Sequence, residues 1–460
     1  MDILKRTRGI DLKAKDSGIH GKLVIQMRDP LTKKIKEEIR HENFLTQALS
    51  SLYNSCPYGL NSKIRSNATN SIPYQVPPYK TALGGILVFP NSLGDSVSDY
   101  YPSLASNYPT GYASMINNDQ SDPKQGLFDE YGSQLLDNGY VYLYTWSSLH
   151  GNGPIAAVAL SHANCYKYFS GDPVILGSLY KSSGINFGCA IGMNSKGVYF
   201  AEVVGLNSGK IMFIPYSKSE IELINDTQNL TSEYVSDYTF ENAGNTNQCA
   251  VTETEIHVFT VTSYDSGLNQ SNLRHTTITL ADESYTTENI TVPEHIVGVR
   301  SHVGDVGNDS CHTVAFDGTN VYMAKYGYQS IIKIPLANPA NLTEYAMPAG
   351  YNCCQGSSYV GTKIFIASER NYTSSTIDNI LILGEDGVVR VGPEVGPGWR
   401  GNAELPHYQS GVWAMSAGSR YPKIVGKILT PYCATKANLA EPTQKTTSIE
   451  MIIQYQITQV

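Results

Sequence analysis

The densest group of side chains that could bind a metal lies between residues 301 and 318, in the sequence SHVGDVGNDSCHTVAFDG. Its candidate ligands are His302, Asp305, Asp309, Cys311 and His312. Loops rich in Asp and Gly can bind Ca²⁺, and His with Cys suits Zn²⁺. The same residue types also form hydrogen-bonded turns between strands. We interpret the segment as such a turn and expect no metal or other cofactor; a metal site would use His302, Asp305 and Asp309.

The sequence offers few residues in a catalytic arrangement. Asp129 and Glu130 could act as a carboxylate pair in glycosidic cleavage. Neighbouring side chains of an extended segment point apart, which does not suit a shared substrate. The sequence contains no P-loop, HExxH or GxSxG motif, no GxGxxG motif followed by an expected helix, and no sialidase-type S-x-D-x-G-x-T-W box. We therefore predict a protein that is not an enzyme.

The eight cysteines lack the spacing of a zinc site or a disulfide framework. No CxxC pair occurs, and the adjacent Cys353 and Cys354 cannot easily bridge to each other. We expect reduced, mostly buried thiols in a protein that is made in a reducing cytoplasm. They are Cys56, Cys165, Cys189, Cys249, Cys311, Cys353, Cys354 and Cys433.

Tyrosine is the most abundant aromatic residue, with 32 copies against 3 of Trp, and it recurs in a polar excursion at 90–133. Tyr side chains on loops offer contact area at low entropy cost and are enriched in binding surfaces. Alternatively, they pack the excursion onto the rest of the molecule. The candidates for a display surface are Tyr100, Tyr101, Tyr108, Tyr112 and Tyr131.

Charge is sparse and unevenly distributed. Only 16% of the 460 residues are charged and the net charge is −8, which argues against a disordered chain and against a nucleic-acid partner. No apolar run suits a membrane span, and the start MDILKRTRGIDLKAKDSG lacks the apolar region of a secretory signal. Residues 1–50 nevertheless hold 11 Lys and Arg against 7 Asp and Glu. This basic end is either a solvated hairpin or a docking surface, with Lys5, Arg6, Arg8, Lys13 and Lys15 as its docking residues.

The two chain ends carry complementary elements. Residues 22–28 and 33–40 predict a hairpin around DPLT, and 43–53 predict an amphipathic helix capped by Asn43. Residues 447–458 alternate apolar and polar side chains, as in a half-buried strand. We predict that these pieces form one small α+β domain from residues 1–56 and 431–460. Residues 57–133 are expected to be an irregular connection with one strand at 84–89.

Between the ends, short aromatic and apolar strands recur. They start at Tyr140, Val198, Ile256, Val321, Ile364 and Val412, at intervals of 58, 58, 65, 43 and 48 residues. Four-stranded propeller blades repeat at about 40–50 residues. The fold class is therefore all-β dominated, with a β-propeller-like domain at 134–430 inserted into the end-derived domain. Each strand start should lie in a different blade, with Asp317-Gly318 and Asp386-Gly387 at tight turns; a pair of β-sandwich sheets is the alternative.

Three stretches carry a resemblance. Residues 21–53 combine the hairpin, an H-E-N triplet and the expected helix, followed by the GGI-L-F strand at 84–89. Residues 147–168 contain SSLHGNGPIAAVALSHANCYKY, and 428–458 read ILTPYCATKANLAEPTQKTTSIEMIIQYQIT. Together they resemble virion structural proteins of bacteriophages that infect Firmicutes hosts, in particular appendages of the tail-fibre, baseplate or collar type.

The resemblance implies a virion location after synthesis in the host cytoplasm, with other virion proteins as partners. The expected function is a non-enzymatic appendage that docks through its terminal domain and displays a propeller to a glycan or protein of the host surface. The expected assembly is a homo-oligomer, with no membrane or nucleic-acid partner. Two alternatives remain: a purely structural collar or decoration protein, and a propeller glycosidase or depolymerase acting on wall polysaccharide.

Overall fold

The computed structural model describes residues 19–49, 83–97, 108–163, 165, 173–177, 187–194, 196–205, 208–215, 233–236, 247–297, 311–360, 363–370, 379–394, 403–404, 407–408, 411–416, 424–428 and 432–459. The chain forms two compact units. Unit 1 comprises Met1–Val174, Gln409–Gly411 and Thr430–Val460, and unit 2 comprises Ile175–Tyr408 and Val412–Leu429. None of the described helical residues forms a helix long and apolar enough to cross a membrane.

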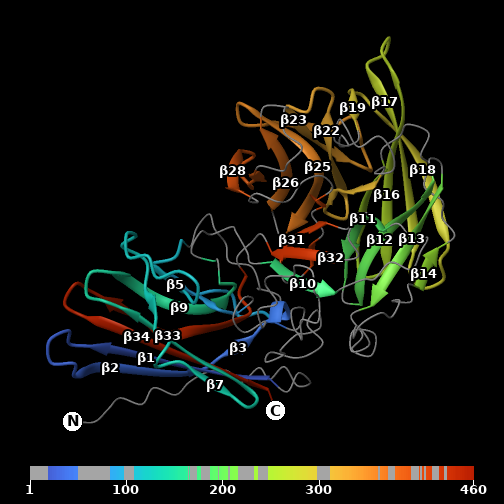
Figure 1. Cartoon of the computed structure of the whole chain (residues 1–460). Helices are drawn as coiled ribbons and strands as arrows, with labels where there is room; N and C mark the ends of the chain where they lie inside the picture. The colour runs from blue at the N-terminus through green and yellow to red at the C-terminus, as the bar shows by residue number, and fades with distance from the viewer. Residues whose placement is uncertain are drawn as a thin grey trace. The chain divides into compact units, whose positions relative to one another are not determined.

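Unit 1 contains a sheet built from both chain ends, which we call the terminal sheet. Its strands, in spatial order, are β2 (Ile35–Glu42), β1 (Ile19–Arg28), β34 (Glu450–Gln459), β8 (Gly139–Trp146) and β6 (Leu127–Phe128), with β7 (Gln134–Leu136) also pairing with β8. β34 lies between β1 and β8 and is antiparallel to both (Figure 1). The predicted pairing of the C-terminal strand with the N-terminal hairpin is confirmed.

A second sheet covers the terminal sheet. Its strands, in order, are β3 (Phe44–Leu45), β33 (Thr435–Lys445), β9 (Gly153–Ser161), β4 (Gly85–Phe89) and β5 (Gly111–Ser114). The Tyr455 and Thr435 hydroxyls hydrogen-bond to each other across the two sheets. The Tyr144 hydroxyl donates to the carbonyl of Gly84 at 3.0 Å. Unit 1 is therefore a β-sandwich whose core receives alternate side chains of β1, β34 and β8.

The expected helix at 43–53 begins later than predicted. Phe44 and Leu45 form β3, which pairs with Lys436 and Thr435 of β33. The helical turn starts at Gln47, and the backbone N–H of Ala48 donates to the Thr46 hydroxyl at 3.2 Å. Thr46, not Asn43, therefore takes the capping position. Pairing with a distant strand overrides the local helical pattern, which sequence periodicity cannot reveal.

The described residues of unit 2 form five sheets built mainly of antiparallel strands, which we call the blades. The first has β11 (Phe187–Met193), β12 (Gly197–Gly205), β13 (Ser208–Pro215) and β14 (Glu233–Ser236). The second has β15 (Asn247–Val251), β16 (Glu255–Asp265), β17 (Gln270–Thr279) and β18 (Tyr285–Val292), with β20 (Cys311–Thr313) parallel to β15. The third has β19 (Ile296–Val297), β21 (Ala315–Phe316), β22 (Asn320–Lys325), β23 (Ser330–Pro335) and β24 (Thr343–Ala346).

The last two blades complete the ring. The fourth has β25 (Tyr351–Val360), β26 (Lys363–Arg370), β27 (Asn379–Leu383) and β28 (Val389–Glu394). The fifth has β29 (Ala403–Glu404), β30 (His407–Tyr408), β31 (Gly411–Ser416), β32 (Ile424–Ile428) and β10 (Pro173–Gly177). β29 contacts both β25 and β11, so the fifth blade touches the fourth and the first. The five blades form a β-propeller.

Apolar side chains fill the spaces between blades. One cluster joins the first and second blades and includes Tyr199, Ile211 and Val258. A second cluster, with Phe259 and Ile332, joins the second and third blades, and a third joins the third and fourth. The blades therefore stabilise one another by burial of one face against the next.

The fifth blade combines strands from both ends of the propeller sequence. β10 is the outermost strand of the fifth blade and pairs with β32. The chain reaches β10 after β9 and returns from β32 to β33, and β9 and β33 are themselves paired neighbours. The segment that enters the propeller therefore begins at β9, the segment that leaves it ends at β33, and these two strands are neighbours in one sheet of unit 1.

Five of the six predicted strand starts lie in separate blades: Val198 in β12, Ile256 in β16, Val321 in β22, Ile364 in β26 and Val412 in β31. The sixth prediction was wrong, because Tyr140 lies in β8 of the terminal sheet. Tyr142 and Tyr144 of that strand are buried on the face that the second sheet covers, where the Tyr144 hydroxyl reaches Gly84.

The predicted domain boundaries change accordingly. The expected start of the propeller at 134 is too early, and the end-derived domain is larger than 1–56 plus 431–460, since it also contains β4 to β9. The described part of 57–133 holds β4, β5 and β6 rather than a single strand. Gly318 and Gly387 have φ of 91° and 74°, which confirms the two Asp-Gly turns.

Candidate functional site

Many of the residues singled out from the sequence lie outside the described residues. These are Lys5, Arg6, Arg8, Lys13, Lys15, Tyr100, Tyr101, His302, Asp305 and Asp309. Among the residues that the structure describes, no group of three His, Cys, Asp or Glu side chains could hold a metal ion.

The three described tyrosines of the 90–133 excursion have different environments. Tyr131 is fully exposed, and Tyr108 is 57% exposed with the Lys124 ammonium 4.5 Å from its ring centroid. Tyr112 is buried and donates its hydroxyl hydrogen bond to the Asp122 carboxylate. Burial and that carboxylate raise the pKa of Tyr112. Tyr112 thus packs its loop, which was the alternative to a display role.

Asp129 has a structural role in its turn. One of its carboxylate oxygens, Oδ1, accepts hydrogen bonds from the backbone N–H groups of Tyr131 and Gly132, at 3.1 and 2.9 Å. This is the side-chain-to-backbone pattern of an Asx turn. The arrangement accounts for Asp129 without any catalytic partnership with Glu130.

The five cysteines with described side chains are buried and reduced, as predicted: Cys165, Cys249, Cys311, Cys353 and Cys433. Burial raises the pKa of Cys353 to about 12, which keeps it protonated and unreactive. Cys56 and the side chains of Cys189 and Cys354 lie outside the described part of the structure.

The most distinctive exposed feature of unit 2 is a stack of three rings, which we call the Tyr-His-Tyr stack. The ring centroids of Tyr264 and His295 are 3.5 Å apart with an interplanar angle of 6°. Those of His295 and Tyr326 are 4.3 Å apart with an angle of 5°. Tyr264 is 37% exposed and Tyr326 is 67% exposed. The imidazole is therefore held between two phenol rings whose outer parts reach solvent.

Strand pairing between two blades fixes these rings. Tyr264 lies near the end of β16, opposite Ser271 of β17. The Ser271 hydroxyl donates to the carbonyl of Glu294 at 2.8 Å and accepts from the N–H of Ile296 at 3.1 Å. The N–H of Tyr326 in turn donates to the carbonyl of His295 at 2.9 Å. The backbone on both sides of His295 is thus tied to the second and third blades.

A polar network borders the stack. The Lys325 ammonium lies 3.1 Å from the Glu294 carboxylate and 2.9 Å from that of Glu344. The hydrogen bond from Lys325 lowers the pKa of Glu344, and the same contact raises the pKa of Lys325. The Tyr264 hydroxyl donates to the side-chain carbonyl of Asn269 at 2.9 Å. These contacts hold the residues beside the rings in place.

The chemistry of the stack suits the binding of a ligand with a flat face. A rigid tyrosine presents a flat apolar face with a polar hydroxyl at its edge, and little side-chain entropy is lost when a ligand binds. The exposed face of Tyr326 can accept the apolar face of a sugar ring or another aromatic ring. Neighbouring carboxylate and amide groups can then accept or donate hydrogen bonds to ligand hydroxyls.

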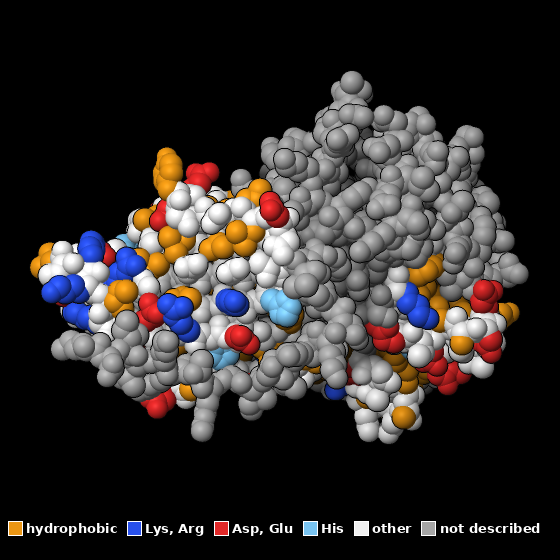
Figure 2. All heavy atoms as spheres, turned by 90° about the horizontal axis from the view of Figure 1, so that it is seen from below, with side chains coloured by type: hydrophobic (Ala, Val, Ile, Leu, Met, Phe, Trp, Pro, Cys, Tyr) orange, Lys and Arg blue, Asp and Glu red, His pale blue; other side chains and the backbone are white. Residues whose placement is uncertain are grey.

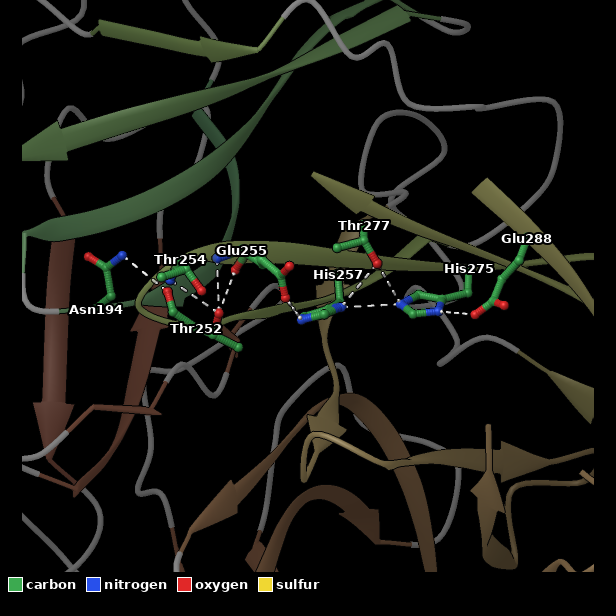
Figure 3. A network of polar contacts seen from close by, with 8 residues as sticks. All are labelled: Asn194, Thr252, Thr254, Glu255, His257, His275, Thr277 and Glu288. Atoms are coloured by element: carbon green, nitrogen blue, oxygen red, sulfur yellow. Dashed lines mark hydrogen bonds and ion pairs between the residues drawn. The ribbon is translucent and has the colours of Figure 1, made fainter. Parts of the chain in front are cut away.

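A second polar cluster in the second blade is largely buried (Figure 3). His257 Nδ1 lies 3.2 Å from His275 Nε2, and His275 Nδ1 lies 2.8 Å from the Glu288 carboxylate. His257 Nε2 is 3.5 Å from the Glu255 carboxylate. Burial, and then the neighbouring His275, lower the pKa of His257 to about 4. His257 is therefore neutral at pH 7.

The surroundings of this histidine pair indicate a structural role. The ring of Phe259 stacks on His275 at 4.5 Å, and the ring of Phe316 lies 4.5 Å from His257. Phe316 comes from the third blade, so the pair is packed between blades. Glu255 and Glu288 connect it to solvent, because their side chains are 42% and 61% exposed.

Sequence reasoning missed the stack and the histidine pair. The stack draws Tyr264 from the end of β16 and one residue from each of two connections, at positions 295 and 326, and none lies in a recognisable motif. Only the pairing of β16 with β17 and of β19 with β22 brings them together. The one usable signal was the presence of aromatic residues where predicted strands end.

The sequence matches no protein-family model, and no curated protein matches it. Solved structures that resemble the chain include a Myxococcus xanthus glutaminyl cyclase, with 9% identity, a TM-score of 0.31, and coverage of 56% of this chain and 97% of that one. A streptogramin B lyase has 15% identity and a TM-score of 0.25, covering 56% and 98%. The β-propeller domain of Myceliophteria thermophila Cps50 (Swd1) has 9% identity and a TM-score of 0.24, covering 66% and 98%.

Proposed function

We propose that the chain is a non-enzymatic structural protein of a bacteriophage virion, an appendage of the tail-fibre, baseplate or collar type. In this proposal unit 1 docks on the particle and the propeller binds the host surface. The Tyr-His-Tyr stack carries the binding role, because it is exposed and is fixed by two blades. The docking role is supported by the stretches that resemble virion proteins, whose described parts include β1, β2, β9, β33 and β34, all in unit 1.

The proposed ligand of the propeller is a host-surface glycan or a protein loop with an exposed aromatic side chain. One stacking contact is worth about 0.5–1.5 kcal/mol, so a single copy would bind weakly. Several copies on one particle would multiply the contacts and raise the overall affinity. A homo-oligomer or a ring of copies therefore suits this role.

The binding role is tested with Tyr326→Ala in the purified full-length protein. Binding to host cell walls should fall by roughly 2- to 10-fold per site, because the exposed ring of the stack is removed. The matched control is Tyr285→Ala: Tyr285 is 59% exposed on β18 of the second blade but is not part of the stack. If both variants bind like the unmodified protein, the stack is not the binding surface.

The docking role is tested by deletion of residues 2–18, which removes Lys5, Arg6, Arg8, Lys13 and Lys15. We expect fewer copies on purified particles, because basic residues can bind an acidic partner subunit. A normal copy number would contradict docking through this segment. Unchanged host adsorption despite loss of copies would favour a collar or decoration role.

The non-enzymatic part of the proposal has its own test. Purified protein is incubated with host wall polysaccharide, and released oligosaccharides are measured. We expect no release above the level of a heat-denatured sample. Release that depends on the folded protein would instead support the glycosidase or depolymerase alternative.

A further inference from the structure

β2 is an edge strand with one paired side. It is first in the order of the terminal sheet and pairs with β1 (Figure 1). No other described strand pairs with its second side. Such an edge offers backbone N–H and C=O groups to an added strand. Five of the eight residues of β2 are exposed, including Ile35 at 48%.

The charges along β2 form a self-complementary pattern. Figure 2 shows Lys and Arg side chains gathered at the left end of the view. In and next to β2, Lys33, Lys34, Lys36 and Arg40 are exposed. Reading outward from Ile39, the neighbours are Glu38 and Arg40, then Glu37 and His41, then Lys36 and Glu42. Each pair joins a carboxylate to a basic side chain. Two of the three pairs, Glu38 with Arg40 and Lys36 with Glu42, therefore carry opposite charges at equal distances in sequence from Ile39.

The register with β1 tells which face of the sheet each side chain shares. Ile39, Glu37 and His41 lie opposite Ile25, Met27 and Leu23, whose side chains are buried. Glu38 and Arg40 lie opposite Gln26 and Val24 on the other face. Successive side chains alternate between faces along the regular pairing from Glu37 to Glu42, so Glu38, Arg40 and Glu42 share one face. Lys36 lies at the register shift that follows, where Arg28 pairs with Ile35.

We propose that two copies of the chain associate through β2, which pairs antiparallel with β2 of the second copy about a two-fold axis at Ile39. The two terminal sheets then become one continuous sheet. Glu38 of each copy faces Arg40 of the other, Lys36 faces Glu42, and Glu37 faces His41. Ile39 meets its own copy at the axis, on the face that carries the core of unit 1.

Sheet geometry leaves few competing registers. A two-fold axis relating two antiparallel edge strands is perpendicular to the sheet, so residues that face each other lie on the same face. An axis at Glu38 would place Glu38 against itself and Lys36 against Arg40. An axis at Arg40 would place Arg40 against itself and Glu38 against Glu42. Of these three registers, only the one at Ile39 avoids facing like charges, which are unfavourable in cross-strand pairs.

The charge states at neutral pH fit this register. The Arg40 guanidinium, 2.7 Å from Glu38 in the same chain, lowers the pKa of the Glu38 carboxyl and so keeps it ionised. Burial lowers the pKa of His41, so its imidazole is neutral and can donate one hydrogen bond to Glu37 of the other copy. Glu37 already accepts a hydrogen bond from Thr443 at 2.8 Å, which holds its carboxylate in place.

The test measures self-association of the full-length protein by sedimentation at several concentrations. Glu38→Arg places Arg against Arg40, and Arg40→Glu places Glu against Glu38, so each single variant should dissociate roughly 10- to 100-fold more readily. The double variant Glu38→Arg with Arg40→Glu restores opposite charges and should associate again. An equimolar mixture of the two single variants should form heterodimers, because one variant then carries two basic side chains at positions 38 and 40 and the other carries two acidic ones.

The control is Gln454→Glu, which changes charge on an exposed residue of β34, inside the same sheet. It should leave the association unchanged. The proposal is overturned if the unmodified protein stays monomeric at all concentrations, if the single variants associate normally, or if the mixture fails to associate. Because the readout is self-association alone, a negative result leaves the proposed virion role untouched.

Discussion

The two units reach a packed β structure by opposite routes. Unit 1 depends on pairing between residues far apart in the sequence, such as Ile25 of β1 with Ile453 of β34. In unit 2 most blades come from one continuous stretch, with hairpins such as β16 and β17. Unit 1 therefore needs both chain ends to fold. Among the described blades, the pairing over the longest sequence distance is that of β10 with β32 in the fifth blade.

The largest expected effect comes from removing β34. Deletion of residues 450–460 leaves β1 and β8 without the strand that separates them and exposes the buried faces of both. We expect unit 1 to unfold while unit 2 keeps a cooperative thermal transition, measured by scanning calorimetry. Loss of every transition would show that the propeller cannot fold without unit 1.

Two matched core substitutions sharpen the comparison. Ile453 in β34 and Ile332 in β23 are both fully buried, the first in unit 1 and the second between two blades. Replacing either by Ala should lower the free energy of unfolding by about 2–5 kcal/mol. Ile453→Ala should shift only the transition of unit 1, and Ile332→Ala only that of unit 2. A common shift from either variant would mean that the units unfold together.

The free energy of unfolding of unit 2 should depend on pH through His257. Its folded pKa of about 4 lies below the value of about 6.5 in an unfolded chain. Between these values the unfolded chain binds a proton that the folded chain excludes, so the contribution is complete above pH ~6.5 and is lost as pH falls towards 4. We expect a loss of about 1–3 kcal/mol in this window.

The groups that face His257 identify the cause of that loss. They are His275, Glu255, Thr277 and the ring of Phe316 from the third blade. His257→Gln should flatten the pH profile of unfolding of unit 2 between pH 4 and 6.5. Chemical denaturation of both proteins across this range provides the measurement, and an unchanged slope would assign the effect to other groups.

The smallest predicted effect concerns a turn within one blade. Gly387 has φ of 74°, a conformation that side chains with a Cβ disfavour, and a Cβ there would meet Tyr345 at an ordinary 3.4 Å. Gly387→Ala should therefore cost about 1–2 kcal/mol, from backbone strain alone. Gly387→Asn should cost less, since Asn tolerates this conformation better. Urea unfolding of unit 2 would rank the two variants; equal values would exclude strain as the cause.

The difference between the units also explains what could be predicted from sequence. Strands starting at Val198, Ile256, Val321, Ile364 and Val412 were identified because a blade repeats a local pattern of strand and turn. Tyr140 followed the same local pattern, but it pairs with β34, at the far end of the chain. Phe44 and Leu45 likewise follow a helical pattern and form a strand because Thr435 and Lys436 lie beside them.

The candidate site was less predictable than the fold. Tyr264, His295 and Tyr326 meet only when blades two and three are assembled, and single residues from three separate segments leave no spacing to recognise. The tyrosines that were singled out share a polar loop, a compositional signal that does not distinguish exposed Tyr131 from buried Tyr112. Burial depends on partners such as Asp122, which composition cannot supply.

The double connection between the units has a mechanical consequence. The chain leaves unit 1 from β9 and returns to β33, which are paired, and it enters and leaves the propeller by β10 and β32, which are paired as well. A pulling force applied between the two units is therefore shared by the connection from β9 to β10 and the connection from β32 to β33. At each end these connections emerge from neighbouring strands of one sheet. Each connection carries only part of the load, whereas a single linker would carry all of it.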